Sequence, residues 1–286
     1  MRAELIELYK FRELLYTLVV RELRVRYKNS FLGFFWSLLN PLVTVMVMTL
    51  IFKHVMGMKI ANYSAYVLAA YLPWTFFQFA LLDSSQTVLA YMPVIKKIYF
   101  PRELLPISAI IANFIHFLLA MGVFLVYLHI FVGAPVQATM LLVPLLMIAQ
   151  LLLTLGLSFF IASLNVFYED IKYLVSIGVQ LLFFLSPVIY FSEQIRHASL
   201  VPEAYRQTAF YLYHGLNPIA TILTLYRKLM LPPITVEQSN LGVTRALTEE
   251  PLPAWLLCAN GLTAILIALA GYAYFNRKKW LFVERP

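Results

Sequence analysis

A basic segment that runs directly into a long uncharged segment constrains this chain more than any other feature. The sequence RYKNSFLGFFWSLLNPLVTVMVMTLIF occupies residues 26–52, and no charged residue lies between Phe31 and Phe52. As a helix, a run of this length would extend roughly 33 Å at about 1.5 Å per residue, which is enough to cross a hydrocarbon core of about 30 Å. We therefore predict a transmembrane helix whose basic end faces the cytoplasm.

The residues before this span have an amphipathic pattern. On a helical wheel, residues 8–28 place leucine, valine and phenylalanine side chains opposite a polar face. We predict that residues 1–30 form a cytoplasmic interface helix that lies along the membrane surface. Its basic candidate interface residues are Lys10, Arg21, Arg24 and Lys28. Glu22 and Arg26 fall on the apolar side, so contact of this part with a partner protein is an alternative.

Composition identifies the class of protein. Apolar residues make up 62% of the chain and charged residues 13%, with a mean hydropathy of +0.78; soluble domains have about 25% charged residues. The apolar runs are continuous and lack the alternation of barrel strands, which predicts an all-α integral membrane protein. The net charge of +8 fits basic cytoplasmic loops and anionic headgroups better than nucleic acid.

The sequence contains no recognisable catalytic motif. Cys258 is the single cysteine, so no intrachain disulfide can form, and its apolar surroundings predict a small buried residue. None of the ten glycines belongs to a phosphate-binding loop, and the hydrolase and metalloprotease motifs are absent. We expect no catalytic residue, metal site or bound cofactor in this chain, so any ATP and Mg would be bound by another subunit.

Six apolar runs are long enough to be membrane spans within a single transmembrane domain, residues 31–286. The runs are 31–52, 66–91, 107–132, 140–164, 174–191 and 254–275. An even number of spans places both termini on one side. Seven basic residues precede the first run, three lie near Lys96, one is Lys172 and four follow the last run, so fifteen of the 22 would be cytoplasmic.

Residues 192–253 form a long external region between the last two runs. Its first part is apolar but is interrupted between His214 and Pro218, which predicts two short helices that dip into the membrane or lie on its external face. Pro218 suits the first turn of the second helix. The polar residues 232–253 are predicted to be an exposed loop.

Two short cytoplasmic loops connect the middle spans. The first, MPVIKKIYFPRELLPI, contains prolines at 93, 101 and 106 and basic and aromatic residues between them. We predict a short helix with rigid ends there. The second loop, NVFYEDIKYL, places Glu169 and Asp170 just beyond the fourth span, where a solvated turn is the alternative to a functional contact.

Several residues within or near the membrane are candidates for a translocation path: Trp74, Phe77, Asp83, Tyr211 and Tyr213. Asp83 lies about two turns from the cytoplasmic end of the second span, where a lipid-facing charge would be costly. It therefore faces protein, water or the interface, with Asn113 and His116 as possible partners. The aromatic residues could guide a sugar chain, and ordinary packing or an interfacial belt is the alternative.

The order and spacing of five motifs resemble the membrane subunits of type-2 ABC exporters for O-antigen, capsule or teichoic-acid polymers. The motifs are RYKNSFLGFFWSLLNP at 26–41, KKIYFPRELLP at 96–106, NVFYED at 165–170, SPVIY at 186–190 and LNP at 216–218 with Arg227 following. This resemblance covers nearly the whole chain. It implies a homodimeric permease in the bacterial inner membrane, with both termini cytoplasmic and no nucleic-acid partner.

The resemblance also implies roles for individual segments. It implies that two ATP-binding cassette subunits, which carry ATP and Mg, contact a coupling element made of two loops. The residues of that element would be Lys96, Lys97, Tyr99, Phe100, Pro101, Arg102, Glu103, Glu169 and Asp170. In this interpretation Tyr99 and Phe100 are apolar anchors and the external helices are a re-entrant gate. The family usually has Phe-Arg-Asp where this chain has Tyr168, Glu169 and Asp170.

The resulting hypothesis is export of a lipid-linked polysaccharide by a permease that depends on a separate ATPase. An ABC exporter of a lipid, glycolipid or drug is the alternative within the same class. An ion-coupled secondary transporter would be expected to contain several buried carboxylates, whereas only Asp83 lies inside a predicted span. An enzyme acting on lipid-linked glycans would need an acid–base pair, which the sequence does not show.

Overall fold

The computed structural model describes residues 7–28, 35–55, 62–197, 201–233, 235–240, 243–248 and 252–283. Within these residues the chain is predominantly helical, as the composition predicts. Four helical stretches there are long and apolar enough to cross a membrane: Tyr63–Ala90, Leu104–Phe131, Ala138–Phe167 and Ala254–Phe282. The other two apolar runs contain the shorter helices Leu39–Val55 and Ile171–Leu185.

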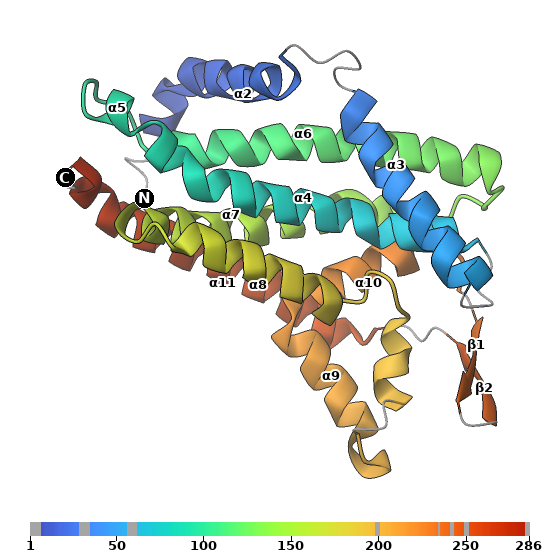
Figure 1. Cartoon of the computed structure of the whole chain (residues 1–286). Coiled ribbons are helices and arrows are strands. Elements are labelled where there is room, and N and C mark those ends of the chain that lie inside the picture. Colours follow the sequence, from blue (N-terminus) through green and yellow to red (C-terminus); the bar gives the residue numbers. More distant parts are fainter. Residues whose placement is uncertain are drawn as a thin grey trace.

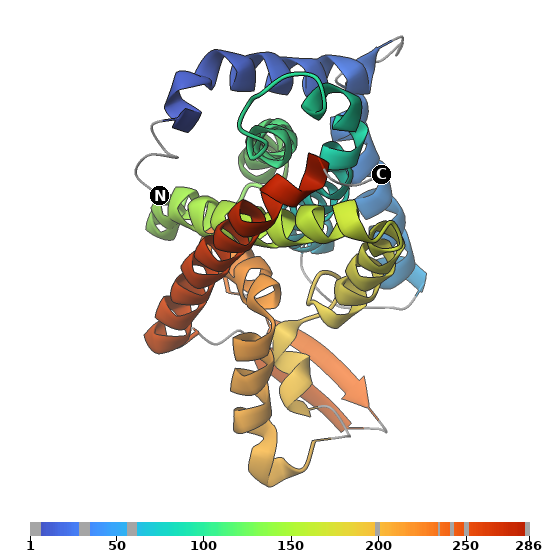
Figure 2. The same ribbon diagram turned by 90° about the vertical axis from the view of Figure 1, so that its left-hand side faces the viewer.

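The first half of the chain contains the helix at the amino-terminal end of the described part and the first spans. Its elements are α2 (Arg12–Tyr27), α3 (Phe35–Thr49), η1 (Leu50–Val55), α4 (Tyr63–Ala90), α5 (Met92–Ile95), α6 (Leu104–Val126) and η2 (Tyr127–Phe131). Figures 1 and 2 show α2 lying across α6 instead of continuing the bundle.

The second half of the chain completes the bundle and adds the segment before the last long helix. Its elements are η3 (Ala138–Leu142), α7 (Val143–Phe167), α8 (Ile171–Leu185), η4 (Ser192–His197), η5 (Glu203–Tyr205), α9 (Arg206–Leu216), α10 (Pro218–Met230), β1 (Thr235–Asn240), β2 (Val243–Thr248), α11 (Ala254–Lys278) and η6 (Lys279–Val283). In Figure 1, α5 and the carboxyl-terminal end of α11 lie at one end of the bundle, and the β strands lie at the other.

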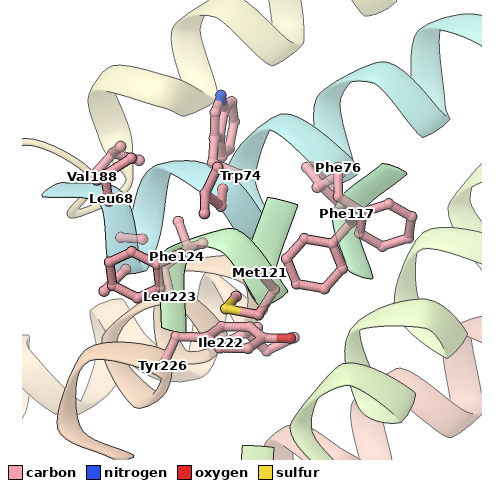
Figure 3. Packing of buried hydrophobic residues seen from close by; sticks show 14 of the residues in the cluster. Leu68, Trp74, Phe76, Phe117, Met121, Phe124, Val188, Ile222, Leu223 and Tyr226 are labelled. Carbon is pink, nitrogen blue, oxygen red and sulfur yellow. The ribbon is translucent and has the colours of Figure 1, made fainter. Parts of the chain in front are cut away.

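The central helix of the bundle is α4, which packs against α3, α6, α7, α8 and α10. Its buried side chains meet those of α6 and α10 in one apolar cluster, and Figure 3 shows Phe76, Phe117, Met121 and Tyr226 within it. Gln150 of α7 is fully buried and donates from Nε2 to the carbonyl oxygen of Pro73, 2.7 Å away. This bond pairs the buried amide N–H of Gln150 with a backbone carbonyl and fixes α7 against α4.

Helices α7 and α11 approach each other closely at Gly156 and Gly271. A Cβ atom placed on Gly156 would lie 2.6 Å from the Cα of Ala268, and one on Gly271 would lie 2.9 Å from the Cα of Gly156. Neither position has room for a side chain. The two glycines therefore allow backbone contact between the helices, as small residues do at membrane helix interfaces.

The segment before α11 contains two short helices and a hairpin. Asn217 caps α10 by accepting from the backbone N–H of Ala220 at 3.1 Å, and Pro218 follows in the first turn. Residues 235–240 and 243–248 form strands and not the loop predicted from their polarity. Here β1 and β2 pair antiparallel, from Thr235 opposite Thr248 to Asn240 opposite Val243, because β-branched residues in this segment favour extended backbone.

Cys258 also differs from its prediction. It is exposed on α11, whereas its apolar surroundings predict a buried residue. The long contact of α11 is with α7, so one side of α11 packs and the rest of its surface carries apolar side chains outward. In a membrane protein an apolar neighbourhood therefore does not imply burial within the chain.

Candidate coupling surface and polar membrane site

The connection between α4 and α6 contains the predicted coupling segment, residues 96–106. Helical structure in this connection is limited to the single turn of α5, which precedes Lys96, and residues 96–103 are turns, a bend and irregular backbone. The predicted short helix is thus shifted towards α4. Pro101 explains why Phe100 is not helical, because a residue that precedes proline disfavours helical backbone.

Phe100 is a core residue and not an exposed anchor. Its side chain is only 6% exposed and packs in a cluster with Ile95, Leu104 and Leu105. This corrects the prediction that Phe100 offers an apolar contact to an ATPase. The apolar side chains exposed here are those of Ile98 and Tyr99, at 58% and 68%.

Arg102 and Glu103 bind the carboxyl-terminal segment instead of forming a rim. Glu103 is buried and its carboxylate pairs with Nζ of Lys279 over 2.5 Å. Arg102 donates to the carbonyl oxygen of Lys279, and its guanidinium lies 5.7 Å from the centre of the Trp280 ring. Partial burial lowers the pKa of Arg102 below its ordinary value. Because η6 occupies both side chains, they fix the coupling segment to the end of α11.

Tyr99, Lys96 and Lys97 remain on the surface of this segment. The Tyr99 hydroxyl donates to Oε1 of Glu7 at 3.0 Å, and this hydrogen bond raises the pKa of the Tyr99 phenol above 10.0. Both lysines are exposed. The exposed face from Lys96 to Tyr99 therefore combines two cations with two apolar side chains, a combination suited to a protein contact.

The second predicted contact lies in the turn between α7 and α8. Tyr168, Glu169 and Asp170 are all exposed in this turn. Asn165 holds its geometry, because Nδ2 of Asn165 donates to the carbonyl oxygen of Ser85 at 2.8 Å and Oδ1 accepts from the backbone N–H of Lys172 at 3.1 Å. The turn is therefore fixed to α4. In the sequence, Asn165 was noted only as the first residue of the NVFYED motif. An amide side chain at the end of an apolar run is the signal that could have identified it as a residue that positions this turn.

The interface helix α2 has the predicted polar face, with Arg21 and Arg24 exposed on it, and Lys10 and Lys28, which flank α2, are also exposed. Its two charges on the apolar side contact this chain itself. Glu22 accepts from the Tyr91 hydroxyl at 3.0 Å, and Arg26 donates from Nη1 to Oδ1 of Asn113 at 3.0 Å. These side chains therefore dock α2 on the helix bundle, which explains their departure from the amphipathic pattern.

Asp83 is the acceptor at the centre of this docking site. Its Oδ2 accepts from Arg26 and, at 2.8 Å, from Nδ2 of Asn113. The Asp83 side chain is 41% exposed and that of Arg26 is 35% exposed. The sequence predicted Asn113 as a partner but missed Arg26, which is 57 residues from Asp83. Asp83 and His116 both line a cavity between α2, α3, α4 and α6.

Trp74 and Phe77 lie in the core and do not line an open path. Both side chains are almost fully buried. The Trp74 ring lies 5.8 Å from that of Phe77 and 5.6 Å from that of Phe183 on α8, and Nε1 of Trp74 donates to Oε1 of Gln78 at 2.9 Å. Figure 3 shows Trp74 among the apolar cluster. In this structure both rings therefore pack in the core, and Phe183 of α8 contacts the Trp74 ring.

Tyr211 and Tyr213 are half-buried in contacts around α9. The Tyr213 hydroxyl donates to the carbonyl oxygen of Leu185 at 2.7 Å and lies 3.2 Å from the Tyr190 hydroxyl. The Tyr211 ring packs 5.5 Å from that of Trp255. The two tyrosines thus connect α9 to different elements, and the structure does not bring them together with Trp74 or Asp83 in one site.

Arg227 forms a fully buried site that the sequence analysis named only as part of a motif. Its side chain is 1% exposed. Nε donates to the carbonyl oxygen of Tyr66 at 3.0 Å, Nη1 donates to the carbonyls of Pro187 at 2.6 Å and Tyr190 at 3.2 Å, and Nη2 donates to that of Val188. One cation therefore satisfies the irregular backbone that follows α8.

Comparison with known proteins identifies the family. Residues 13–231 match the sequence profile of the ABC-2 type transporter family, which is more than half of the chain. The chain belongs to the ABC-2 type transporter family. Its apolar helices and its family membership together identify the chain as a multi-pass membrane protein. The family match also confirms the resemblance inferred from the motifs.

Three relatives of this ABC-2 transporter chain are described as O-antigen export system permease protein RfbA. Two, from Klebsiella pneumoniae, are each 29% identical over 272 residues, covering 95% of this chain and 94% of the relative. The third, from Myxococcus xanthus, is 34% identical over 221 residues, covering 77% of this chain and 81% of the relative. The similarity thus spans nearly the full length of the two Klebsiella proteins.

Proposed function

We propose that this chain is the permease subunit of an ATP-driven exporter that moves a lipid-linked polysaccharide such as O-antigen, capsule or teichoic acid across the inner membrane. The observation that carries the proposal is its similarity, over 95% of its length, to permeases named for O-antigen export. The polymer class is taken from these relatives. The arrangement of the cytoplasmic loops adds independent support for coupling to a separate ATPase.

Two surfaces at one end of the bundle suit an ATPase contact. Residues 96–99 are exposed after α5, and residues 168–170 are exposed before α8. Both are fixed to the bundle, the first through Lys279 and the second through Asn165. A contact that transmits ATP hydrolysis must move with the helices that it controls, and these attachments provide that rigidity. We assign ATP and Mg to two cassette subunits that bind here.

A topology of six spans fits the two shorter helices as well as the four long ones. Together α3 and η1 cover residues 35–55, which would extend about 31 Å at about 1.5 Å per residue. By the same measure α8 is too short alone at about 22 Å. It is continued by the segment containing Pro187 and Val188, whose carbonyls Arg227 satisfies. Irregular backbone is tolerated at membrane depth only with such partners.

The proposed orientation places both termini and α5 in the cytoplasm, and α9, α10 and the hairpin at the external face as a gate region. The concentration of basic residues in the predicted cytoplasmic loops supports it.

A homodimer is supported by α8, which exposes apolar side chains along much of its length. These are Tyr173, Leu174, Ile177, Leu181, Phe184 and Leu185. Since Trp74 and Phe77 are buried, the aromatic residues available to a polymer path are exposed ones such as Phe184.

Transport by the purified complex tests the proposal. The full-length chain, co-purified with its ATPase, is reconstituted into proteoliposomes with a labelled lipid-linked polysaccharide. We expect translocation that requires ATP, is blocked by vanadate and is lost when the ATPase is omitted. Movement driven by an ion gradient without ATP would instead indicate a secondary transporter. Equal transport of a lipid that carries no polysaccharide would favour the lipid-exporter alternative.

A further inference from the structure

A mixed polar and apolar cavity opens between α2, α3, α4 and α6, apart from the coupling surface. Its volume is about 470 Å³. The polar part of its lining consists of Arg26, Asn40, Thr75, Asp83, Asn113 and His116, and the apolar part is largely aromatic: Trp36, Tyr71, Phe76, Phe79 and Phe117. Figure 1 shows α3 crossing α6 and α4 beside the end of α2.

Two further cavities with largely apolar walls adjoin this one along α3, α4 and α6, and we call the three together the groove. Pro41 and Ala120 belong to the wall of the first cavity and also to that of a narrow second cavity lined by leucine, valine and phenylalanine side chains. Leu42, Leu68 and Tyr127 are shared between this second cavity and a third one of about 370 Å³. The second cavity is only about 20 Å³ in volume, so the groove is a charged head end followed by an apolar surface with a narrow point, an arrangement that suits an amphiphile.

The charges at the head end suit a zwitterion. Arg26 and Asp83 pair with each other, yet both side chains stay more than one third exposed at the cavity. Oδ2 of Asp83 accepts the hydrogen bonds from Arg26 and Asn113. Oδ1 accepts none from the part of the chain that the structure describes. A ligand ammonium can bind this oxygen while its phosphate meets the guanidinium. A diphosphate, with several negative charges, would be repelled by the same carboxylate.

The depth of the head end matches the boundary between headgroups and acyl chains. Asp83 lies seven residues before Ala90, the last residue of α4, which is about 10 Å along the helix at about 1.5 Å per residue. In the proposed orientation this places the charges within the cytoplasmic leaflet. The open rim of the cavity is apolar, because Trp36 and Phe79 are 52% and 41% exposed. A lipid can therefore approach from the side.

We propose that this groove binds a zwitterionic phospholipid of the cytoplasmic leaflet, with a primary ammonium and one phosphate, as in phosphatidylethanolamine. The ammonium binds Asp83, the phosphate binds Arg26, and one acyl chain follows α3 past Ala120. Because Arg26 lies at the end of α2, the bound lipid stabilises the docking of α2 on α4 and α6. The site is separate from the polymer path, so the proposal does not depend on which polymer the exporter carries.

Native mass spectrometry of the full-length chain, titrated with phosphatidylethanolamine or phosphatidylglycerol of the same acyl chains, tests this site. We expect about tenfold tighter binding of phosphatidylethanolamine, since one charge-assisted hydrogen bond supports a difference of that size. Asp83→Asn should remove the preference. Ala120→Phe, which fills the groove without changing a charge, should weaken both lipids. Glu203→Gln removes an equivalent charge from an exposed side chain on η5 and should change neither.

Folding and competing occupants are separated by further measurements on the same samples. Thermal unfolding identifies a variant that fails to fold. If Asp83→Asn fails to fold, Ala120→Phe tests the site instead. Equal binding of the two lipids by the unmodified chain would overturn the proposal. Tighter binding of a polyisoprenyl diphosphate would assign the groove to the transport substrate instead. Loss of the dimer in Ala120→Phe would show that a second copy covers the groove.

Discussion

The guanidinium of Arg227 lies 3.8 Å from the centre of the Tyr66 ring and donates to both the carbonyl and the hydroxyl oxygen of Tyr66, each at 3.0 Å. The two residues are 161 positions apart. Their contact joins α10 to α4, while the remaining donors of Arg227 hold the backbone after α8. Helix α10 and the central helix α4 are thus connected through one buried cation, whose planar fork reaches several acceptors at once.

Replacing Arg227 with lysine should destabilise the protein although the charge is kept. Lysine cannot reach the separated carbonyls, and each buried acceptor left unpaired costs about 1–3 kcal/mol. We expect Arg227→Lys to lower the unfolding free energy in detergent by about 3 kcal/mol, measured by denaturant titration. Arg12→Lys, on the exposed face of α2, is the matched control and should stay within about 0.5 kcal/mol. Equal stability of both variants would show that the fork geometry is unimportant.

Alanine at Gly271 should separate α11 from α7. Its Cβ would overlap the backbone of Gly156, and overpacking of this kind costs about 1–3 kcal/mol. Gly178→Ala on α8 is the control, because a Cβ there meets no atom within 4 Å. We expect Gly271→Ala to lower the thermal midpoint and Gly178→Ala to leave it unchanged or raise it. A tolerated alanine at position 271 would contradict the close contact.

Removal of Lys279 should be more damaging than removal of the whole ion pair. Lys279→Met leaves the Glu103 carboxylate buried without its cation, and breaking a buried pair in this way costs about 3–5 kcal/mol. The double variant Glu103→Gln with Lys279→Met contains no buried charge at this site, so it should recover most of the loss. Unfolding of the two variants and of the original chain gives the comparison. Identical stability of the single and double variants would exclude coupling between the two residues.

The proposed topology predicts opposite accessibility for Gln238 in β1 and Lys278 at the end of α11. In a chain with Cys258→Ala, a membrane-impermeant maleimide added to spheroplasts should label Gln238→Cys and not Lys278→Cys. Permeabilised cells are the control, because both positions should then react. The reverse pattern in intact spheroplasts would place the termini outside and would invalidate the assignment of the coupling surface to the cytoplasm.

The apolar runs were sufficient to predict a helical membrane protein, because a membrane requires length and low charge and both can be counted in a sequence. The hairpin was missed since polarity indicates exposure but does not distinguish a loop from strands. Partners distant in sequence were also inaccessible. Arg26 could be recognised as a residue that breaks the amphipathic pattern, yet its partner Asp83 follows only from the crossing of α2 over α4 and α6.

Tyr99 and Phe100 show why neighbouring site residues could not be separated by sequence. Both are aromatic, and a residue before proline favours extended backbone, in which successive side chains point to opposite sides. One of them must then face the core and the other solvent. Nothing in their chemistry decides which, and the structure resolves the choice through the apolar cluster around Leu104 and Leu105 that encloses Phe100.

This difference leads to separate predictions for the two residues, both conditional on the proposed function. Tyr99→Ala should insert and fold normally but should weaken ATPase binding by about 2 kcal/mol, or roughly 30-fold, if Tyr99 is an interface anchor. Phe100→Ala should instead lower stability by about 3–5 kcal/mol through the cavity that it leaves. Tyr205→Ala, on the exposed external segment, is the control for loss of a surface tyrosine. Thermal unfolding, co-purification of the ATPase and polymer export are measured for all three variants. Normal export and normal ATPase association in Tyr99→Ala would refute the coupling role, whereas loss of ATPase binding without loss of stability would locate it at this side chain.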